Sequence, residues 1–238
     1  MHPSTSTASA TPHVLIVPGY QGSGEAHWQS WLERQLPQAR RVQRIDWSQP
    51  VLSVWAGEVR REIQQARQPF WIVAHSFGCL ATAVAVSDRP EKVLGVILVA
   101  PADPRRFHLL GCYGEHAPDE YDGNRRIPVL RVLPLRPLPV SGLLISSDND
   151  PWLSTAAAAE LSASWGLPQQ SLGEAGHINV ESGYGPWPWL LDHLNHLHQA
   201  RASDALEPVM DARMPRGRGS VLAHIRQLTR QQMDRHIV

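Results

Sequence analysis

The sequence of 238 residues predicts an α/β fold, in which a doubly wound, mostly parallel sheet carries helices on both faces. Short runs of β-branched residues and leucine alternate along the chain with longer stretches of helical periodicity. The links between these elements are short, so successive strands are expected to be parallel and joined by right-handed crossovers. Hydrophobic residues make up 42% of the chain and charged residues 18%, which is typical of a globular protein with a substantial core.

The first half of the chain predicts three strands that alternate with three helices. The strands are short runs rich in Val, Ile and Leu, and the helices show apolar residues every three or four positions or a dominance of small apolar residues. The predicted strands cover residues 14–17, 40–47 and 70–73, and the predicted helices cover residues 25–36, 50–66 and 78–87.

The second half resumes the alternation around one irregular stretch. Residues 92–101 form an unbroken apolar run, which is typical of a central strand in a parallel sheet. Residues 102–140 are rich in Pro and Arg and show few long apolar periods. Further strands are predicted within residues 140–147 and 168–179, and further helices over residues 155–166 and 186–200.

The chain is expected to hold one folded domain between two appended ends. Residues 1–12 are rich in Ser, Thr, Ala and Pro, and are expected to be a disordered lead. The domain is expected to span residues 13–200. Residues 201–238 predict a flexible tether followed by an amphipathic helix, either solvated or in contact with another protein or subunit.

Charge and composition argue against several classes of partner. Basic and acidic residues are equal at 22 each, so no global field draws the protein to nucleic acid or to an anionic membrane. The first residues lack the pattern of a signal peptide and no apolar run is long enough to span a bilayer, so a cytoplasmic protein is expected. Lys92 is the only lysine among the basic residues, a composition that favours a GC-rich bacterial source. Cys79 and Cys112 lack metal-ligand spacing and do not indicate a disulfide scaffold.

The stretch Ala74-His75-Ser76-Phe77-Gly78 is the first candidate for chemistry. It follows a predicted strand and opens a predicted helix, as does the G-x-S-x-G turn that exposes a nucleophilic serine. The first glycine of that pattern is replaced here by Ala74, the smallest substitute for it. The motif therefore makes Ser76 a candidate nucleophile.

Two further residue types complete a possible catalytic set. Ser76, then Asp148 and Asp150, then His177 each follow a predicted strand, and parallel strands bring such positions to one edge of the sheet. A serine needs a base to take its proton, and a histidine base needs an acid to orient it. Asp150 is preferred to Asp148 because it precedes Pro151, which biases it to extended backbone outside the following helix.

The order Ser, Asp, His along the chain is that of the α/β-hydrolases. In that fold the oxyanion hole is formed by two backbone N–H donors from different segments. One donor is expected to be the backbone N–H of Phe77, directly after the nucleophile. The other is expected in the loop Pro18-Gly19-Tyr20-Gln21, with the N–H of Tyr20 as the first choice and that of Gln21 as the second.

Four segments together resemble the small serine hydrolases of the retinoblastoma-binding protein nine and YdeN type. They are VLIVPGYQGSGEAHWQSWL, AHSFG, LLISSDNDPWLS and EAGHIN, and the resemblance covers roughly residues 13–199. It implies an α/β-hydrolase fold without a large cap domain, with Ser76, Asp150 and His177 as the triad. It also implies esterase or amidase chemistry that needs no cofactor.

These observations predict a serine hydrolase that cleaves an ester, thioester or amide of a small acyl substrate. The alternative is a binding module on the same fold, which would not need to keep all three residues of the triad. The loop 19–24 has the spacing G-x-x-G-x-G and so does not match a dinucleotide-binding turn. His193 and His196 have the spacing of metal ligands, but they fit equally a polar helix end, and no metal is expected.

Overall fold

The structure, a computed structural model, describes residues 11–113 and 127–206. It divides into two compact units, one formed by His13–Trp187 and another that includes the helix α5 (Pro188–Leu206). The predicted lead 1–12 and tail 201–238 lie almost entirely outside the described residues. The first unit contains the sheet and all the residues that the sequence singles out for catalysis.

Six parallel strands form the sheet of the first unit, in the order β2-β1-β3-β4-β7-β8. They are β1 (Val14–Val17), β2 (Ala39–Arg41), β3 (Phe70–Ser76), β4 (Val93–Pro101), β7 (Gly142–Ser146) and β8 (Gln169–Ser171). Every residue of β1 and β3 is buried, as expected for central strands covered on both faces.

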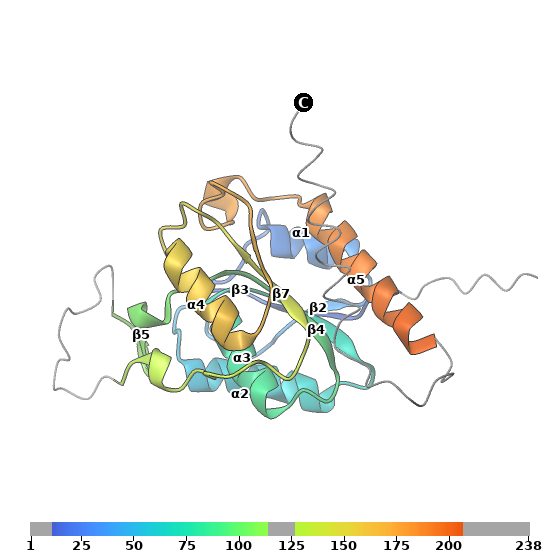
Figure 1. The fold of residues 1–238 in the computed structure, drawn as a ribbon, viewed down its shortest axis with the longest axis horizontal. Coiled ribbons are helices and arrows are strands. Elements are labelled where there is room, and N and C mark those ends of the chain that lie inside the picture. The colour runs from blue at the N-terminus through green and yellow to red at the C-terminus, as the bar shows by residue number, and fades with distance from the viewer. Residues whose placement is uncertain (1–10, 114–126, 207–238) are drawn as a thin grey trace, which may run out of the picture. The chain divides into compact units, whose positions relative to one another are not determined.

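Helices cover both faces of this sheet, as the sequence predicts (Figure 1). The helices of this unit are α1 (Trp28–Gln35), α2 (Leu52–Gln65), α3 (Phe77–Asp88) and α4 (Thr155–Trp165). On one face α2, α3 and α4 contribute Trp55, Phe77 and Trp165 to a cluster with Leu15 and Leu98 of the sheet. On the opposite face lies α1, and the fold is that of an α/β-hydrolase.

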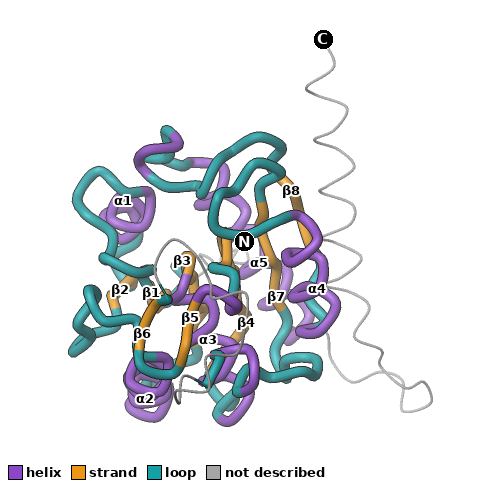
Figure 2. The backbone as a smooth tube through the Cα atoms, turned by 90° about the vertical axis from the view of Figure 1, so that its left-hand side faces the viewer, coloured by secondary structure: helices purple, strands orange, loops and turns teal. Residues whose placement is uncertain are grey.

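The stretch between β4 and β7 forms no large cap within its described residues, 102–113 and 127–141. Its elements there are η1 (Pro104–Arg106), β5 (Phe107–His108), β6 (Gly111–Cys112) and η2 (Val129–Arg131). Strands β5 and β6 form a small antiparallel hairpin. In the view of Figure 2 this hairpin lies in front of the sheet. The hairpin brings Phe107 to the edge where the strands of the sheet end.

Several predicted elements differ from the observed ones in length. The helix predicted over residues 25–36 is shorter, Trp28–Gln35, and the strand predicted over residues 70–73 continues to Ser76. The strand predicted over residues 40–47 covers only Ala39–Arg41, and Arg44, inside the predicted stretch, adopts a positive φ of 64°, which does not occur in extended strand. The helix predicted over residues 186–200 continues to Leu206 as α5. A last short helix, η3 (Val180–Ser182), follows β8.

The strand order reverses beside β1, which lies between β2 and β3. In doubly wound sheets such a switch point opens a crevice at the carboxyl ends of the strands. The register pairs Val17 with Ala74, so the loop after β1 and the turn after β3 emerge side by side. The sheet thereby sets the loop of Tyr20 against Ser76.

Candidate active site

Ser76 occupies a sharp, strained turn between β3 and α3. Its φ of 52° and ψ of −127° lie in a region that a residue with a side chain rarely adopts. Only 7% of the residue is exposed to solvent. This conformation turns the hydroxyl out of the strand and toward the crevice, as in the nucleophile elbow of α/β-hydrolases.

The two glycine positions around Ser76 are not equivalent. A Cβ at Gly78 would lie 2.3 Å from the carbonyl oxygen of Pro18, so a side chain there would collide with the end of β1. Ala74 is fully buried and belongs to the cluster beneath α2 and α3, so its methyl group has a place in the core. The turn therefore needs glycine at 78 and accommodates alanine at 74.

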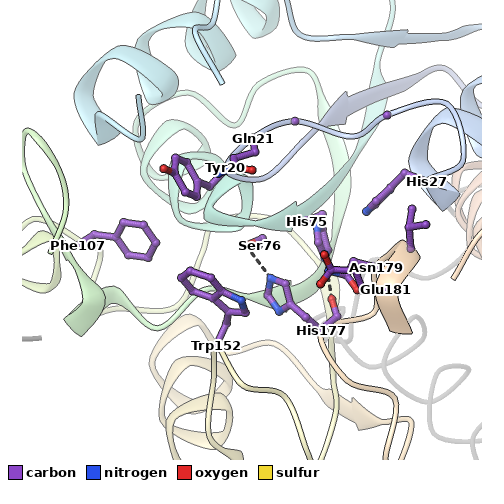
Figure 3. Close-up of a pocket in the computed structure, with 13 residues that line it drawn as sticks. Tyr20, Gln21, His27, His75, Ser76, Phe107, Trp152, His177, Asn179 and Glu181 are labelled. Carbon is purple, nitrogen blue, oxygen red and sulfur yellow. Dashed lines mark hydrogen bonds between the residues drawn. The ribbon is translucent and has the colours of Figure 1, made fainter. Parts of the chain in front are cut away.

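A continuous hydrogen-bond chain joins Ser76, His177 and Asp150. Figure 3 shows its first link, from Ser76 to His177. His177 Nδ1 lies 2.9 Å from Asp150 Oδ1 and 3.0 Å from Oδ2, and His177 Nε2 lies 2.9 Å from Ser76 Oγ. A carboxylate only accepts, so Nδ1–H donates to Asp150, which leaves Nε2 of the neutral ring to accept from the serine hydroxyl. The Asp150 side chain is 1% exposed.

The two candidate acids have different partners. Asp148 Oδ1 accepts a hydrogen bond of 2.6 Å from Ser171 Oγ at the exposed edge of the sheet. Asp150 Oδ1 accepts from the Trp152 backbone N–H at 2.8 Å in addition to its contact with His177. The structure thus brings Asp150, and not Asp148, to the histidine.

The loops that carry Asp150 and His177 are tied to each other. Asn149 Oδ1 accepts from the backbone N–H of Gly176 at 2.6 Å. Ser147 Oγ accepts from the backbone N–H of Ala175 at 2.9 Å and donates to Asn149 Oδ1 at 2.9 Å. These bonds fix the separation of the acid and the histidine independently of the bond between them.

The two expected loop donors differ in their availability. The Gln21 N–H already donates to the Trp47 carbonyl oxygen at 2.8 Å. The backbone N–H groups of Tyr20 and Phe77 donate to no acceptor among the described residues. Gly19 lets the loop approach, since a Cβ there would lie 2.6 Å from Ser76 Cβ.

Two further buried histidines border Ser76 and His177. Burial lowers the pKa of His75 well below the usual range, and the neighbouring His177 and His27 add to the effect. Burial also lowers the pKa of His27 to about 4, with further contributions from Arg41 and His177. Both rings are therefore neutral near pH 7, and His27 Nε2 is buried without a hydrogen-bond partner among the described residues.

A cavity of about 330 Å³ opens over the serine. Figure 3 shows Tyr20, Phe107 and Trp152 on one side of Ser76, and His27, Asn179 and Glu181 on the other. The remaining lining residues are Gln21, Gly22, Gly24, His75, Ser76, His177 and Val180. The cavity thus has an aromatic side and a polar side, with the serine hydroxyl between them.

The sequence-predicted residues meet in this cavity, but some of its walls were not predicted. Ser76, His177, Tyr20 and Gln21 line it, and Asp150 lies buried behind His177. Phe107 and Glu181 carry no sequence signal, because they come from irregular segments. His27 and Trp28 are adjacent in VLIVPGYQGSGEAHWQSWL, one of the four segments that carry the family resemblance, and His75 directly precedes Ser76 in the serine motif.

The profile of the serine hydrolase family matches residues 14–196. The chain belongs to this family. A solved structure described as a YdeN-like hydrolase from Pectobacterium atrosepticum is 34% identical, with 79% of this chain and 91% of that chain covered and a TM-score of 0.64. The family and these structures support hydrolase activity.

More distant structures share the fold. The ydeN gene product of B. subtilis is 21% identical over 78% of this chain and 98% of that chain, with a TM-score of 0.57. Mouse alpha/beta hydrolase domain-containing protein 10 is 16% identical over 80% and 91%, with a TM-score of 0.55. None of the curated proteins compared with the chain matches it in sequence.

The described residues hold neither a metal-binding cluster nor a membrane-spanning helix. Within residues 11–113 and 127–206, no group of three or more His, Cys, Asp or Glu side chains has the arrangement of a metal site. His193 stacks on Trp189 at a centroid distance of 5.0 Å. None of the described helices combines the length and apolarity needed to cross a membrane.

The low pKa of His27 predicts that acid destabilises the fold. In the unfolded chain His27 is protonated below about pH 6.5, whereas in the folded chain its pKa is about 4. The free energy of unfolding therefore falls as the pH drops through this window. His27→Asn keeps a side chain able to cap α1 and removes this proton, and should lessen the loss between pH 7 and pH 5 by up to about 2 kcal/mol.

Urea unfolding at the two pH values measures this difference. Part of the pH dependence should remain in the variant, because His75 and His193 also have lowered pKa values. An undiminished pH dependence in His27→Asn would show that His27 is not the buried neutral group described above.

Proposed function

We propose that the protein is a carboxylesterase that works through an acyl-enzyme on Ser76. The observation that carries the proposal is the hydrogen-bond chain from Asp150 through His177 to Ser76, in the tautomer that leaves Nε2 free to take the serine proton. Ser76 is the nucleophile, His177 is the general base and then acid, and Asp150 orients the imidazole. Thioesters and amides are alternative substrates for the same groups.

The reaction proceeds by two acyl transfers. Ser76 Oγ attacks the carbonyl carbon while its proton passes to His177 Nε2. The tetrahedral intermediate collapses, the bond to the leaving oxygen breaks, and that oxygen takes the proton from Nε2. A water molecule then attacks the acyl-enzyme in the same way, and Ser76 recovers its proton as the acid product leaves.

The oxyanion of each intermediate accepts hydrogen bonds from the backbone N–H groups of Phe77 and Tyr20. Tyr20 is preferred to Gln21 because the Gln21 N–H is already bonded to the Trp47 carbonyl oxygen. Removing one such donor typically costs about 10²–10³-fold in rate. A preformed pair of donors is therefore a large part of the proposed catalysis.

The neutral histidines beside the triad favour the same mechanism. The His75 and His177 rings are 4.9 Å apart, centre to centre, and the His177 ring becomes a cation when it takes the serine proton. A charged His75 would oppose that cation, and burial keeps His75 neutral. The buried Asp150 carboxylate is then the nearest charge to the imidazolium, and it is favourable.

The cavity supports a small substrate with one apolar arm. Its volume of about 330 Å³ lies at the small end of the range for ligand sites. Tyr20, Phe107 and Trp152 supply apolar surface on one side. Among the described residues that line the cavity, Glu181 alone carries a carboxylate, so neutral or cationic esters are preferred to anionic ones.

A cytoplasmic location and a partner for residues 201–238 stay expectations from the sequence.

The catalytic assignment predicts contrasting effects at three positions. A fluorophosphonate probe should label the wild type and fail to label Ser76→Ala. Asp150→Asn should lower kcat for an activated ester by about 10³–10⁴-fold, because the His177 tautomer is no longer fixed. Asp148→Asn is the matched control, since Asp148 bonds to Ser171 instead, and should stay within about twofold of the wild type.

Labelling and steady-state kinetics with p-nitrophenyl esters measure these effects. A folded wild type that resists the probe would indicate the alternative, a binding module without turnover. Loss of turnover in Asp148→Asn but not in Asp150→Asn would show that Asp148, and not Asp150, is the acid of the triad.

The charge of Glu181 predicts a preference between two esters of nearly the same shape. Acetylcholine carries a quaternary ammonium where 3,3-dimethylbutyl acetate carries a neutral tert-butyl group. The wild type should favour the cationic ester in kcat/KM by a few fold, since an exposed charge contributes about 1 kcal/mol or less, and Glu181→Gln should remove that preference.

The ratio of the two kcat/KM values is the measurement, taken at low and at high salt. Salt should weaken the preference in the wild type and leave the ratio in Glu181→Gln unaffected. An equal ratio in both proteins at low salt would rule out Glu181 as a determinant of substrate charge.

A further inference from the structure

The loop that carries His177 adopts left-handed backbone on both sides of the histidine and is strained at Ile178. Gly176 has a φ of 57° and Ile178 a φ of 48°. Glycine adopts this region freely, but a β-branched residue such as isoleucine does so only when its surroundings hold it there. The conformation that aims the His177 ring therefore needs an external restraint at residues 177 and 178.

Two buried side chains from distant parts of the chain bond to the carbonyl groups of these two residues. His75 Nε2 lies 2.9 Å from the His177 carbonyl oxygen, 102 residues away in sequence. Trp28 Nε1 donates to the Ile178 carbonyl oxygen at 2.8 Å, across 150 residues. A carbonyl oxygen only accepts, so the His75 ring carries its proton on Nε2.

The two donors are themselves held in one aromatic cluster. The Trp28 and His75 rings meet edge to face, with their centroids 5.8 Å apart. The His27 ring lies 5.0 Å from His75, and the Trp187 ring lies 5.4 Å from Trp28. Trp28 is fully buried and His75 is 4% exposed, so neither donor has a competing bond to bulk water.

We propose that Trp28 and His75 are positioning residues, which hold the backbone of residues 177 and 178 in its strained form and so fix the His177 imidazole between Asp150 and Ser76. The catalytic consequence rests on the proposed function, but the restraint itself does not. It assigns a role to Trp28 and to His75, the residue before the proposed nucleophile. Both donors act through the backbone of residues 177 and 178.

Four variants separate this role from simple core packing. Trp28→Phe and His75→Leu each remove a donor and keep apolar bulk, whereas His75→Gln keeps an amide donor at a similar distance along the side chain. Trp165→Phe is the matched control: Trp165 is 1% exposed and its Nε1 donates to the Pro134 carbonyl oxygen, away from the cavity.

Hydrolysis of p-nitrophenyl acetate is the first readout. Trp28→Phe and His75→Leu should each lower kcat by roughly tenfold with KM unchanged, the effect of a misaligned base rather than of weaker binding. His75→Gln should recover most of the loss, and Trp165→Phe should match the wild type. Wild-type kcat in both donor-free variants would overturn the proposal.

The proton of the Asp150–His177 hydrogen bond gives a second readout that needs no turnover. Its low-field ¹H NMR signal, assigned by its loss in His177→Gln, should be sharp in the wild type and in Trp165→Phe. It should broaden in Trp28→Phe and His75→Leu as the ring loses its fixed position. A sharp signal in both Trp28→Phe and His75→Leu would contradict the restraint. An inactive wild type together with the predicted broadening would contradict only the proposed function and leave the restraint intact.

Discussion

The close crossing of the β1 end over the turn after β3 is the constraint on which the rest of the site depends. A Cβ at Gly78 would meet the Pro18 carbonyl oxygen at 2.3 Å, and one at Gly19 would meet Ser76 Cβ at 2.6 Å. The two backbones can approach this closely only because both positions are glycine. The approach brings the loop after β1 against the turn that carries Ser76.

The other half of the site depends on how the loops after β7 and β8 are joined. Asn149 and Ser147 bond to the backbone of residues 175 and 176, so the loops of Asp150 and His177 form one hydrogen-bonded body. The aromatic cluster of Trp28 and His75 then anchors this body to α1 and β3. Ser76, Asp150 and His177 thus lie on segments that are hydrogen-bonded to one another rather than on independent loops.

The sequence predicts the parts of the site that follow from strand order and fails where tertiary contacts decide. Parallel strands collect Ser76, Asp150 and His177 at one edge, and the proline after Asp150 distinguishes it from Asp148. The sequence could not exclude Gln21 as a donor, because its N–H is taken up by the Trp47 carbonyl oxygen, a contact between segments 26 residues apart. Phe107 could not be predicted, because its two-residue strand has no period to read.

Covalent trapping tests the central claim, that Ser76 carries the acyl group, most directly. The wild type is mixed with p-nitrophenyl acetate, quenched in acid during the first turnover, digested and examined by mass spectrometry. The acetyl group should appear on the peptide that contains Ser76, and should be absent from that peptide in Ser76→Ala. Acetylation of another residue, or release of product with no adduct on the Ser76 peptide at any time of quenching, would contradict the account.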